Sequence, residues 1–462
     1  MGRHRDTGTR AVVVSPRAVT RRSYGARGIA AVVLARVEED GAFASAALDA
    51  ELGRSIQLDA RDRALATELV YGSLRVLPWL KQELARFAPR GIAALDARVR
   101  GHLVLAAYQL FFTRVPAFAA VNEAVDAIRS ERGTRVASFA NACLRKLATR
   151  AASIDAETKA QAVVESAPPW LRDALSRVFS PEQTNAFLQS AIEPPAAVLR
   201  VEHAAERDAW LERLRQAVPR GTFEPGRWSP HAILARGAGK LHELPGWEAG
   251  AWSIQEEGAQ LVTLAVGARP GEAILDACAG RGNKTALLAR SVGVGAGHVD
   301  ACDVSAAKLD RMTEELRRLD LRTRRAFAVD WTLGSGDVAG SYDRILVDAP
   351  CTGVGTLRRR PEIALRLPPD LGSIARVQLA IASHAAEHLR PGGVIVYVVC
   401  SVLREEGEDI ATALAQAHPE LDAAPFEAPV IRGLFGDVPR FRLLPQAHGT
   451  DGYFAAKFVR RS

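Results

Sequence analysis

The stretch from Gly271 to Thr285, GEAILDACAGRGNKT, constrains the fold of this 462-residue chain more than any other segment. A short apolar run ends at Asp276 and is followed by a loop with two glycines and then by a helical pattern. This order of strand, tight turn and helix opens a doubly wound α/β domain. Glycine permits positive φ and a close approach of the backbone to a ligand at the helix N-terminus. By itself the motif is weak, because it does not fit the phosphate-binding loop Gly-x-x-x-x-Gly-Lys-[Ser/Thr].

Strands and helices are predicted to alternate from Arg269 to the C-terminus, which indicates a parallel sheet with a late, hairpin-like addition. Three predicted strands end in an acid, namely Asp303, Asp330 and Asp348. A single acid at a strand end is usually a helix cap or a turn former. Three in succession behind a glycine turn favour a ligand site, because open α/β sheets bind ligands at the carboxyl ends of their strands. The expected strands are 273–276, 298–303, 326–330, 342–348, 394–399, 441–444 and 453–458, with helices at 306–319, at 373–389 and from 405.

The first third of the chain has a different pattern. Residues 28–150 show apolar residues at helical spacing and predict a bundle of six or seven helices. We expect residues 1–27 to be a disordered tail; they hold seven arginines and one aspartate, and so account for +6 of the net charge of +7. Because the rest of the chain is nearly neutral, charge alone indicates an RNA partner only weakly.

Residues 151–255 mix helical segments with short strands and Pro/Gly-rich turns, which predicts a small α+β connector between the bundle and a C-terminal domain at 256–462. Within the connector, Arg200 follows three apolar residues of a predicted strand. Two readings stay open for this side chain, a contact with RNA phosphate or an ordinary surface arginine.

The remaining composition excludes several classes. No apolar run approaches the ~18 residues of a membrane span. The five cysteines are widely spaced and lack a C-x-x-C pair, which argues against a zinc site or a disulfide framework. We therefore expect no metal, no membrane association and a reducing, cytoplasmic compartment.

Two of these cysteines carry the most specific signal. Cys351 lies in the segment Asp348–Gly355, DAPCTGVG, and Cys400-Ser401 follows the predicted strand 394–399. This pair resembles the RNA 5-methylcytosine methyltransferase family, and the likeness covers nearly the whole chain except the tail. Four segments of the helical part resemble the N-terminal domain of bacterial ribosomal-RNA methyltransferases, which is similar to the RNA-binding antitermination factor NusB. They are Asp62-Arg63 followed by 68–75, ELVYGSLR; 108–110, YQL; 121–125, VNEAV; and 141–145, NACLR. Cys143, in the last of them, is predicted to be a packed core thiol.

The chemistry of such a family explains why two thiols are useful. Carbon 5 of cytosine is too weak a nucleophile to attack a sulfonium methyl group, but addition of a thiolate to carbon 6 activates it. The resemblance implies that Cys400 is this nucleophile and that Cys351 assists release of the product. It further implies that Asp348 binds the edge of the cytosine ring and that Lys284 helps to position base or cofactor.

The resemblance implies a Rossmann-like, class I domain that binds S-adenosylmethionine. In its first motif, Asp276–Thr285, Arg281 stands where the family has proline and Asn283 where it has glycine. Asn tolerates left-handed dihedrals, so we expect the turn to survive, while Arg281 adds a charge near a cationic cofactor. The expected cofactor-binding residues are Cys278, Ala279, Gly280, Arg281, Gly282, Asn283, Lys284, Asp303, Asp330 and Asp348.

The function predicted in this way is methylation of carbon 5 of a cytidine in small-subunit (16S) ribosomal RNA by a monomeric enzyme. Arg358-Arg359-Arg360, just after the Pro-Cys loop, is predicted to reach toward RNA phosphates. Two alternatives remain: the same reaction on transfer RNA or another RNA, and a non-catalytic RNA-binding assembly or antitermination factor.

Overall fold

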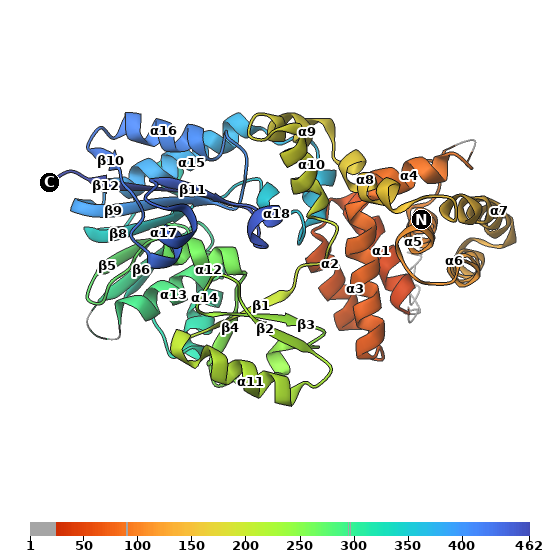
Figure 1. Ribbon diagram of the computed structural model, residues 1–462, viewed down its shortest axis with the longest axis horizontal. Coiled ribbons are helices and arrows are strands. Elements are labelled where there is room, and N and C mark those ends of the chain that lie inside the picture. Colours follow the sequence, from red (N-terminus) through yellow and green to blue (C-terminus); the bar gives the residue numbers. More distant parts are fainter. Residues whose placement is uncertain (1–24, 89–90, 294, 296) are drawn as a thin grey trace, which may run out of the picture.

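The computed structural model describes residues 25–88, 91–293, 295 and 297–462 (Figure 1). Most of the predicted tail, residues 1–24, lies outside the described residues. The first helix, α1 (Ala26–Asp40), begins two residues before the expected start of the helical bundle. A helical end and a sheet-containing end are joined through the connector (Figure 1). Among the described residues, none of the helices combines the length and apolar content that a membrane span requires.

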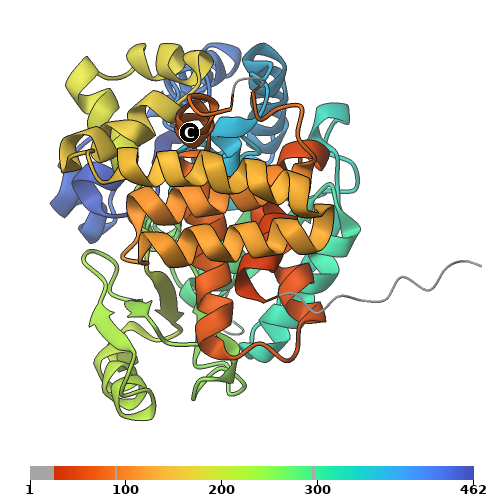
Figure 2. The ribbon, with the colours of Figure 1, turned by 90° about the vertical axis from the view of Figure 1, so that its right-hand side faces the viewer.

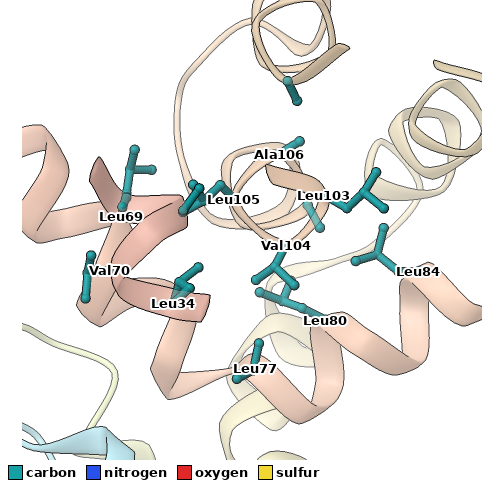
Figure 3. Packing of buried hydrophobic residues seen from close by; sticks show 14 of the residues in the cluster. Leu34, Leu69, Val70, Leu77, Leu80, Leu84, Leu103, Val104, Leu105 and Ala106 are labelled. Atoms are coloured by element: carbon teal, nitrogen blue, oxygen red, sulfur yellow. The ribbon is translucent and has the colours of Figure 1, made fainter. Parts of the chain in front are cut away.

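The helical end is built around α5 (Ala97–Phe112), which is apolar on nearly all sides and therefore buried. Leu103, Val104 and Leu105 of α5 pack against Leu34 of α1 and against leucines of neighbouring helices (Figure 3). Helices of residues 97–151 run side by side when this end is viewed from outside (Figure 2). The other helices are α2 (Ala44–Arg54), α3 (Ala60–Arg75), α4 (Leu77–Ala85), α6 (Ala117–Arg132) and α7 (Thr134–Ala151). Cys143 of α7 is buried in this core, as expected.

The connector has two parts with separate cores. Its helices α8 (Ala156–Ser166), α9 (Pro169–Ser176) and α10 (Pro181–Gln189) share an apolar cluster with residues 354–363 and 402–403 of the C-terminal domain. The second part is an antiparallel sheet in the order β2-β3-β1-β4, which packs on α11 (Arg207–Ala217). Its strands are β1 (Ala197–Val201), β2 (Thr222–Pro225), β3 (Ala232–Arg236) and β4 (Trp252–Ile254).

The C-terminal sheet has the order β10-β12-β9-β8-β5-β6-β7, with β11 paired to β12. Strands β9, β8, β5, β6 and β7 are parallel, and β12 runs antiparallel to β9, so the predicted Rossmann-like class with a late antiparallel addition is confirmed. The strands are β5 (Ala273–Asp276), β6 (His298–Asp303), β7 (Arg325–Ala328), β8 (Tyr342–Asp348), β9 (Leu389–Val399), β10 (Leu421–Ala423), β11 (Arg440–Leu443) and β12 (Tyr453–Arg460).

Helices cover both faces of this sheet and bury two separate apolar clusters against it. They are α12 (Glu257–Leu264), α13 (Asn283–Val292), α14 (Ala306–Arg318), α15 (Leu371–Ala386), α16 (Glu408–Ala417), α17 (Pro429–Phe435) and α18 (Pro445–His448). The strands β8 and β9 are buried on both faces, which is why their sequences read as continuous apolar runs. The short elements β10 and α17 were not expected from the sequence.

Candidate active site

The segment that follows β5 and carries the glycine turn donates backbone hydrogen bonds to both neighbouring strands. Ala277 N–H donates to Leu346 O of β8 at 2.9 Å, and Ala279 N–H donates to Cys302 O of β6 at 2.7 Å. Gly280 and Gly282 both have positive φ, at 59° and 85°. A Cβ on Gly282 would lie 2.4 Å from the Met312 side chain, whereas one on Gly280 would meet open space. The close packing of the turn against Met312 therefore requires glycine at position 282. At Gly280 the outer face of the turn is open.

The two departures from the family motif are placed differently. Asn283 is the first residue of α13 and has helical backbone, so the left-handed conformation expected for it is wrong. The left-handed conformation belongs to Gly282, the N-cap of the same helix. Arg281 is exposed beside the turn. Neither residue therefore strains the loop.

Below the turn lies a buried acid, Asp276. Its Oδ2 accepts a hydrogen bond from Thr285 Oγ1 at 2.7 Å, while its Oδ1 is buried without a partner among the described residues. Burial raises the pKa of Asp276 to about 6. Burial, followed by the nearby charges of Asp348, Asp276 and Asp303, also raises the pKa of the Cys278 thiol well above its usual value. Cys278 is therefore a neutral thiol in the wall of the site.

The predicted strand-end acids have different surroundings. Asp303 is buried, and it accepts hydrogen bonds from Gly280 N–H at 3.1 Å and Ser305 N–H at 2.9 Å. Asp330 is exposed, and β7 ends two residues before it. Its Oδ1 caps a short 3₁₀ turn by accepting from Thr332 N–H and Thr332 Oγ1. Asp303 thus belongs to the glycine turn, whereas Asp330 makes the capping contacts typical of an isolated turn acid.

The two thiols predicted to act together meet in space. Cys351 Sγ and Cys400 Sγ are 3.3 Å apart, in hydrogen-bond contact, and both side chains are half-buried. Their hydrogen bond, together with burial, raises the pKa of Cys351 well above its usual value. The main chain fixes the pair as well, because Gly355 N–H donates to Cys400 O at 3.1 Å.

A second charged pair lies beside the thiols. Lys284 Nζ donates to Asp348 Oδ2 at 2.5 Å, and the same Nζ is 5.9 Å from the centre of the Tyr453 ring. Burial works to lower the pKa of Lys284, but Asp348 and the nearby Cys400 outweigh it, and the net pKa is raised. Lys284 therefore remains a cation that faces both Asp348 and Cys400.

One residue that the sequence did not single out organises the Pro-Cys loop. Glu406 is fully buried, and its carboxylate accepts hydrogen bonds from Thr352 N–H at 2.8 Å and Thr352 Oγ1 at 2.6 Å. Gln378 Nε2 donates to Glu406 Oε1 at 3.2 Å and to Pro350 O at 3.0 Å. Glu406 and Gln378 thereby hold the residues on both sides of Cys351.

Two of the three arginines predicted to reach toward RNA phosphates are paired within the protein. Arg358 Nε and Arg359 Nε both donate to the buried carboxylate of Asp451, at 2.8 and 3.0 Å. Arg360 is exposed and its guanidinium carbon lies 5.1 Å from the centre of the Phe43 ring. The shared pairing with Asp451 fixes the side chains of the first two arginines, and one carboxylate offsets one of their two positive charges.

Both readings of Arg200 are wrong, because its side chain is fully buried. It donates to Gln255 Oε1 at 2.9 Å, to Glu202 Oε1 at 2.5 Å and to the backbone carbonyl of Asn283 at 2.6 Å. This arginine joins the connector sheet to the first turn of α13, directly behind the glycine turn.

Comparisons with known proteins agree with this architecture. The sequence profile described as 16S rRNA methyltransferase RsmB/F matches residues 263–459, and the NusB family profile matches residues 25–149. The chain is 37% identical to the Mycobacterium tuberculosis protein Rv1407, over 94% of this chain and 96% of that protein. It is 33% identical to ribosomal RNA small subunit methyltransferase B of Pseudomonas putida, over 93% and 97% of the two chains.

Solved structures show the same fold. The crystal structure of PH0851 superposes with a TM-score of 0.76 at 22% identity, covering 95% of this chain and 99% of that one. The structure of NSun6 from Pyrococcus horikoshii with SFG has a TM-score of 0.55 at 20% identity and covers 64% of this chain and 98% of that one. With a NusB-type domain, a methyltransferase sheet and near-complete coverage by relatives above 30% identity, the chain belongs to the RsmB/F family of 16S rRNA methyltransferases.

Proposed function

We propose that this protein transfers a methyl group from S-adenosylmethionine to carbon 5 of a cytidine in small-subunit ribosomal RNA. The observation that carries the proposal is the contact of two thiols, 3.3 Å apart, beside the Lys284–Asp348 pair. Two half-buried cysteines at the ligand-binding edge of a parallel sheet are unusual for structural thiols, which are normally packed in a core. We further propose that the protein acts as a monomer in the cytoplasm.

The residues around the glycine turn fit S-adenosylmethionine. The outer face of Gly280 is open, the N-terminus of α13 follows it, and Asp303 lies against its N–H. A carboxylate in this position can accept hydrogen bonds from both hydroxyls of a ribose. The proposed binding set is completed by Cys278, Ala279, Arg281, Gly282, Asn283, Lys284, Asp330 and Asp348. When bound, the cofactor would supply an electrophilic methyl group.

The protein's own residues prepare the base. The Cys400 thiolate forms a bond to carbon 6 of cytosine as the 5,6 double bond opens, and the electron pair moves to carbon 5, which becomes nucleophilic. Carbon 5 would then take the methyl group, and the electrons of the broken methyl–sulfur bond would stay on the sulfur of the departing cofactor. Asp348 binds the ring edge and stabilises the adduct that is protonated there, while Lys284 holds the Asp348 carboxylate in place and stabilises the thiolate. After transfer, the proton on carbon 5 leaves to a base and the bond between Cys400 and carbon 6 breaks.

The proposed division of roles between the cysteines is the one that the resemblance to RNA 5-methylcytosine methyltransferases implies. The contact between the two thiols supports it, because the hydrogen bond to Cys400 and burial raise the pKa of the Cys351 thiol. A protonated Cys351 donates to Cys400 Sγ and stabilises it as a thiolate, both before attack and as a leaving group. Lys284 faces Cys400 and stabilises the same negative charge. We therefore assign Cys400 as nucleophile and Cys351 as the group that assists release.

The test is a pair of substitutions assayed with ribosomal RNA and methyl-labelled S-adenosylmethionine. Cys400→Ala should abolish methyl transfer, and Cys351→Ala should leave protein covalently trapped on RNA, visible as a slow band on a denaturing gel. Bisulfite sequencing of the product should show one protected cytidine in small-subunit RNA. Turnover by Cys400→Ala would refute the nucleophile assignment.

Two alternatives are separated by the same reagents. Protected cytidines in transfer RNA alone would favour the same reaction on another RNA. RNA binding without methyl transfer or cofactor binding would favour an assembly or antitermination factor, the role suggested by the NusB-type domain.

A further inference from the structure

A cleft of about 960 Å³ lies where the helical domain, the connector and the segment after the Pro-Cys loop meet. One wall is formed by α3 and α5, and the opposite wall by residues 192–195 together with Arg358 and Arg359. Helix α3 lies on the side of the helical domain that faces the rest of the molecule (Figure 1). At the upper end of the ~300–1,000 Å³ range typical of ligand pockets, the cleft has room for more than a single small group.

Aromatic rings form the wall on the helical domain. Tyr71 of α3 and Tyr108 and Phe112 of α5 line the cleft, and the rings of Tyr108 and Phe112 are stacked with centres 5.7 Å apart. Gly72 makes room for this arrangement, because a Cβ there would lie 2.1 Å from the Tyr108 hydroxyl and 2.2 Å from its ring carbon. The Tyr108 ring can therefore approach α3 this closely only because residue 72 lacks a side chain.

The polar groups of this wall are available to a ligand. The hydroxyls of Tyr71 and Tyr108 have no hydrogen-bond partner in the part of the chain that the structure describes, and neither is sealed from solvent. Arg75 donates to Arg358 O at 2.8 Å, and its Nε is buried beneath the rings without a partner among the described residues. The cleft thus combines aromatic rings and free hydroxyls with a fixed guanidinium, and Glu68 and Glu193 add two carboxylates to its lining.

We propose that this cleft binds nucleotides of single-stranded RNA that flank the target base, by stacking their bases on Tyr71 and Tyr108. Aromatic faces with an adjacent arginine are the usual surface for unpaired bases, since every base presents a π-face. The inference rests on the proposed function, because it places RNA on the protein, and it assigns residues that reach beyond the methyl-transfer site.

Continuity with the reaction site favours RNA over a peptide as the occupant. Arg358 lies only seven residues after Cys351, and its backbone carbonyl is the acceptor for Arg75. Its side chain is anchored to Asp451, two residues before Tyr453, whose ring faces Lys284. One chain segment, residues 351–358, therefore connects the Pro-Cys loop to the aromatic wall.

The experiment measures binding of a fluorescein-labelled, 20-nucleotide single-stranded RNA from small-subunit ribosomal RNA by anisotropy. Tyr71→Leu and Tyr108→Leu keep apolar volume but remove the ring faces, and each should weaken binding about five- to hundredfold, as loss of one base–aromatic stack does. The loss should be equal at low and high salt, because stacking releases no counterions. Gly72→Ala, which displaces Tyr108 without deleting it, should weaken binding in the same direction.

The matched control is Phe118→Leu, since Phe118 is an exposed ring on α6 of the same domain, outside the cleft. It should leave the affinity unchanged. In the unmodified protein, 5-iodouridine placed in the same RNA should photo-crosslink to Tyr71 or Tyr108, which tests the site without any variant.

The outcomes separate the two proposals. Unchanged affinity of both tyrosine variants, with no crosslink in the cleft, would overturn the cleft assignment even if the unmodified protein methylates ribosomal RNA. Failure of the unmodified protein to bind or methylate any RNA would overturn the proposed function together with the cleft.

Discussion

Glu406 gives the sharpest test of how the Pro-Cys loop is positioned. Its buried carboxylate accepts two hydrogen bonds from Thr352 and one from Gln378, while Tyr397 OH donates to its backbone carbonyl at 2.7 Å. Replacement by alanine removes the acceptor for the residue next to Cys351. We expect Glu406→Ala to destabilise the fold and to loosen the loop that carries this thiol.

The magnitude follows from the contacts. The two bonds to Thr352, at 2.8 and 2.6 Å, are made to a charged acceptor. Such bonds contribute ~1.5–3 kcal/mol each, so loss of both costs ~3–6 kcal/mol. Because Thr352 is half-buried, water can reach it and replace part of this loss, and we expect about 3–4 kcal/mol. Glu406→Gln keeps the shape and one acceptor oxygen and should cost about half as much.

Three measurements check this prediction. Urea unfolding gives the free energy, the reaction of Cys351 with a thiol reagent gives loop mobility, and methyl transfer gives kcat. Because the Cys351 thiol is no longer held in place, Glu406→Ala should lower kcat by about 100-fold. The control is Glu408→Ala, which removes a pair with Arg442 nearer the surface and should cost only ~0–1 kcal/mol.

The reasoning would be refuted by Glu406→Ala unfolding within about 1 kcal/mol of the unmodified protein, the range of an ordinary surface change. It would equally be refuted if Glu406→Gln lowered the unfolding free energy as much as Glu406→Ala does. The side-chain shape and the acceptor oxygen that glutamine keeps would then contribute nothing to stability.

Three further predictions concern parts of the site that lie behind the reacting groups. Burial raises the pKa of Asp276 to about 6, so the native state keeps a proton that the unfolded chain has lost, and stability falls as the pH rises from about 4 to about 6; Asp276→Asn should abolish this fall in urea titrations. Arg200→Met leaves buried Glu202 with the longer contact to Arg290 alone and should cost ~3–5 kcal/mol, against less than ~1 kcal/mol for Arg207→Ala at the surface. Gly355→Ala places a Cβ 2.0 Å from a backbone oxygen and should lower the unfolding free energy by ~3 kcal/mol.

The fold could be predicted because its signals are local. Helical periodicity marked the N-terminal bundle, and the glycine turn with its flanking apolar runs marked the parallel sheet. Boundaries were less predictable: β7 ends at Ala328 although the apolar pattern continues to Val329, because Asp330 turns the chain by capping with Thr332. The short β10 was not predicted, because its pairing with the end of β12 leaves no periodic pattern.

The sequence did not reveal which charged side chains are buried. Glu405 and Glu406 are adjacent, yet the first pairs with Arg177 near the surface and the second lies in the interior. From the sequence alone, arginines such as Arg200 in a strand and the run 358–360 are both expected to be exposed. Their hydrogen-bond partners are distant along the chain, so the sequence gives no sign of the pairing. Only the tertiary fold brings those partners within hydrogen-bond distance.

The two thiols, in contrast, follow from the register of the sheet. Strands β8 and β9 are parallel neighbours, and Asp348 is paired with Val398. Cys351 and Cys400 therefore lie three and two residues beyond a pair of adjacent positions, at the same edge of the sheet. Separation by 48 intervening residues is irrelevant, because the crossover helix α15 returns the chain to the neighbouring strand. The register of the strands does not determine the direction in which the Pro-Cys loop leaves β8. That direction is fixed at Gly355, whose N–H donates to Cys400 O and whose carbonyl accepts a hydrogen bond from Gly452 N–H.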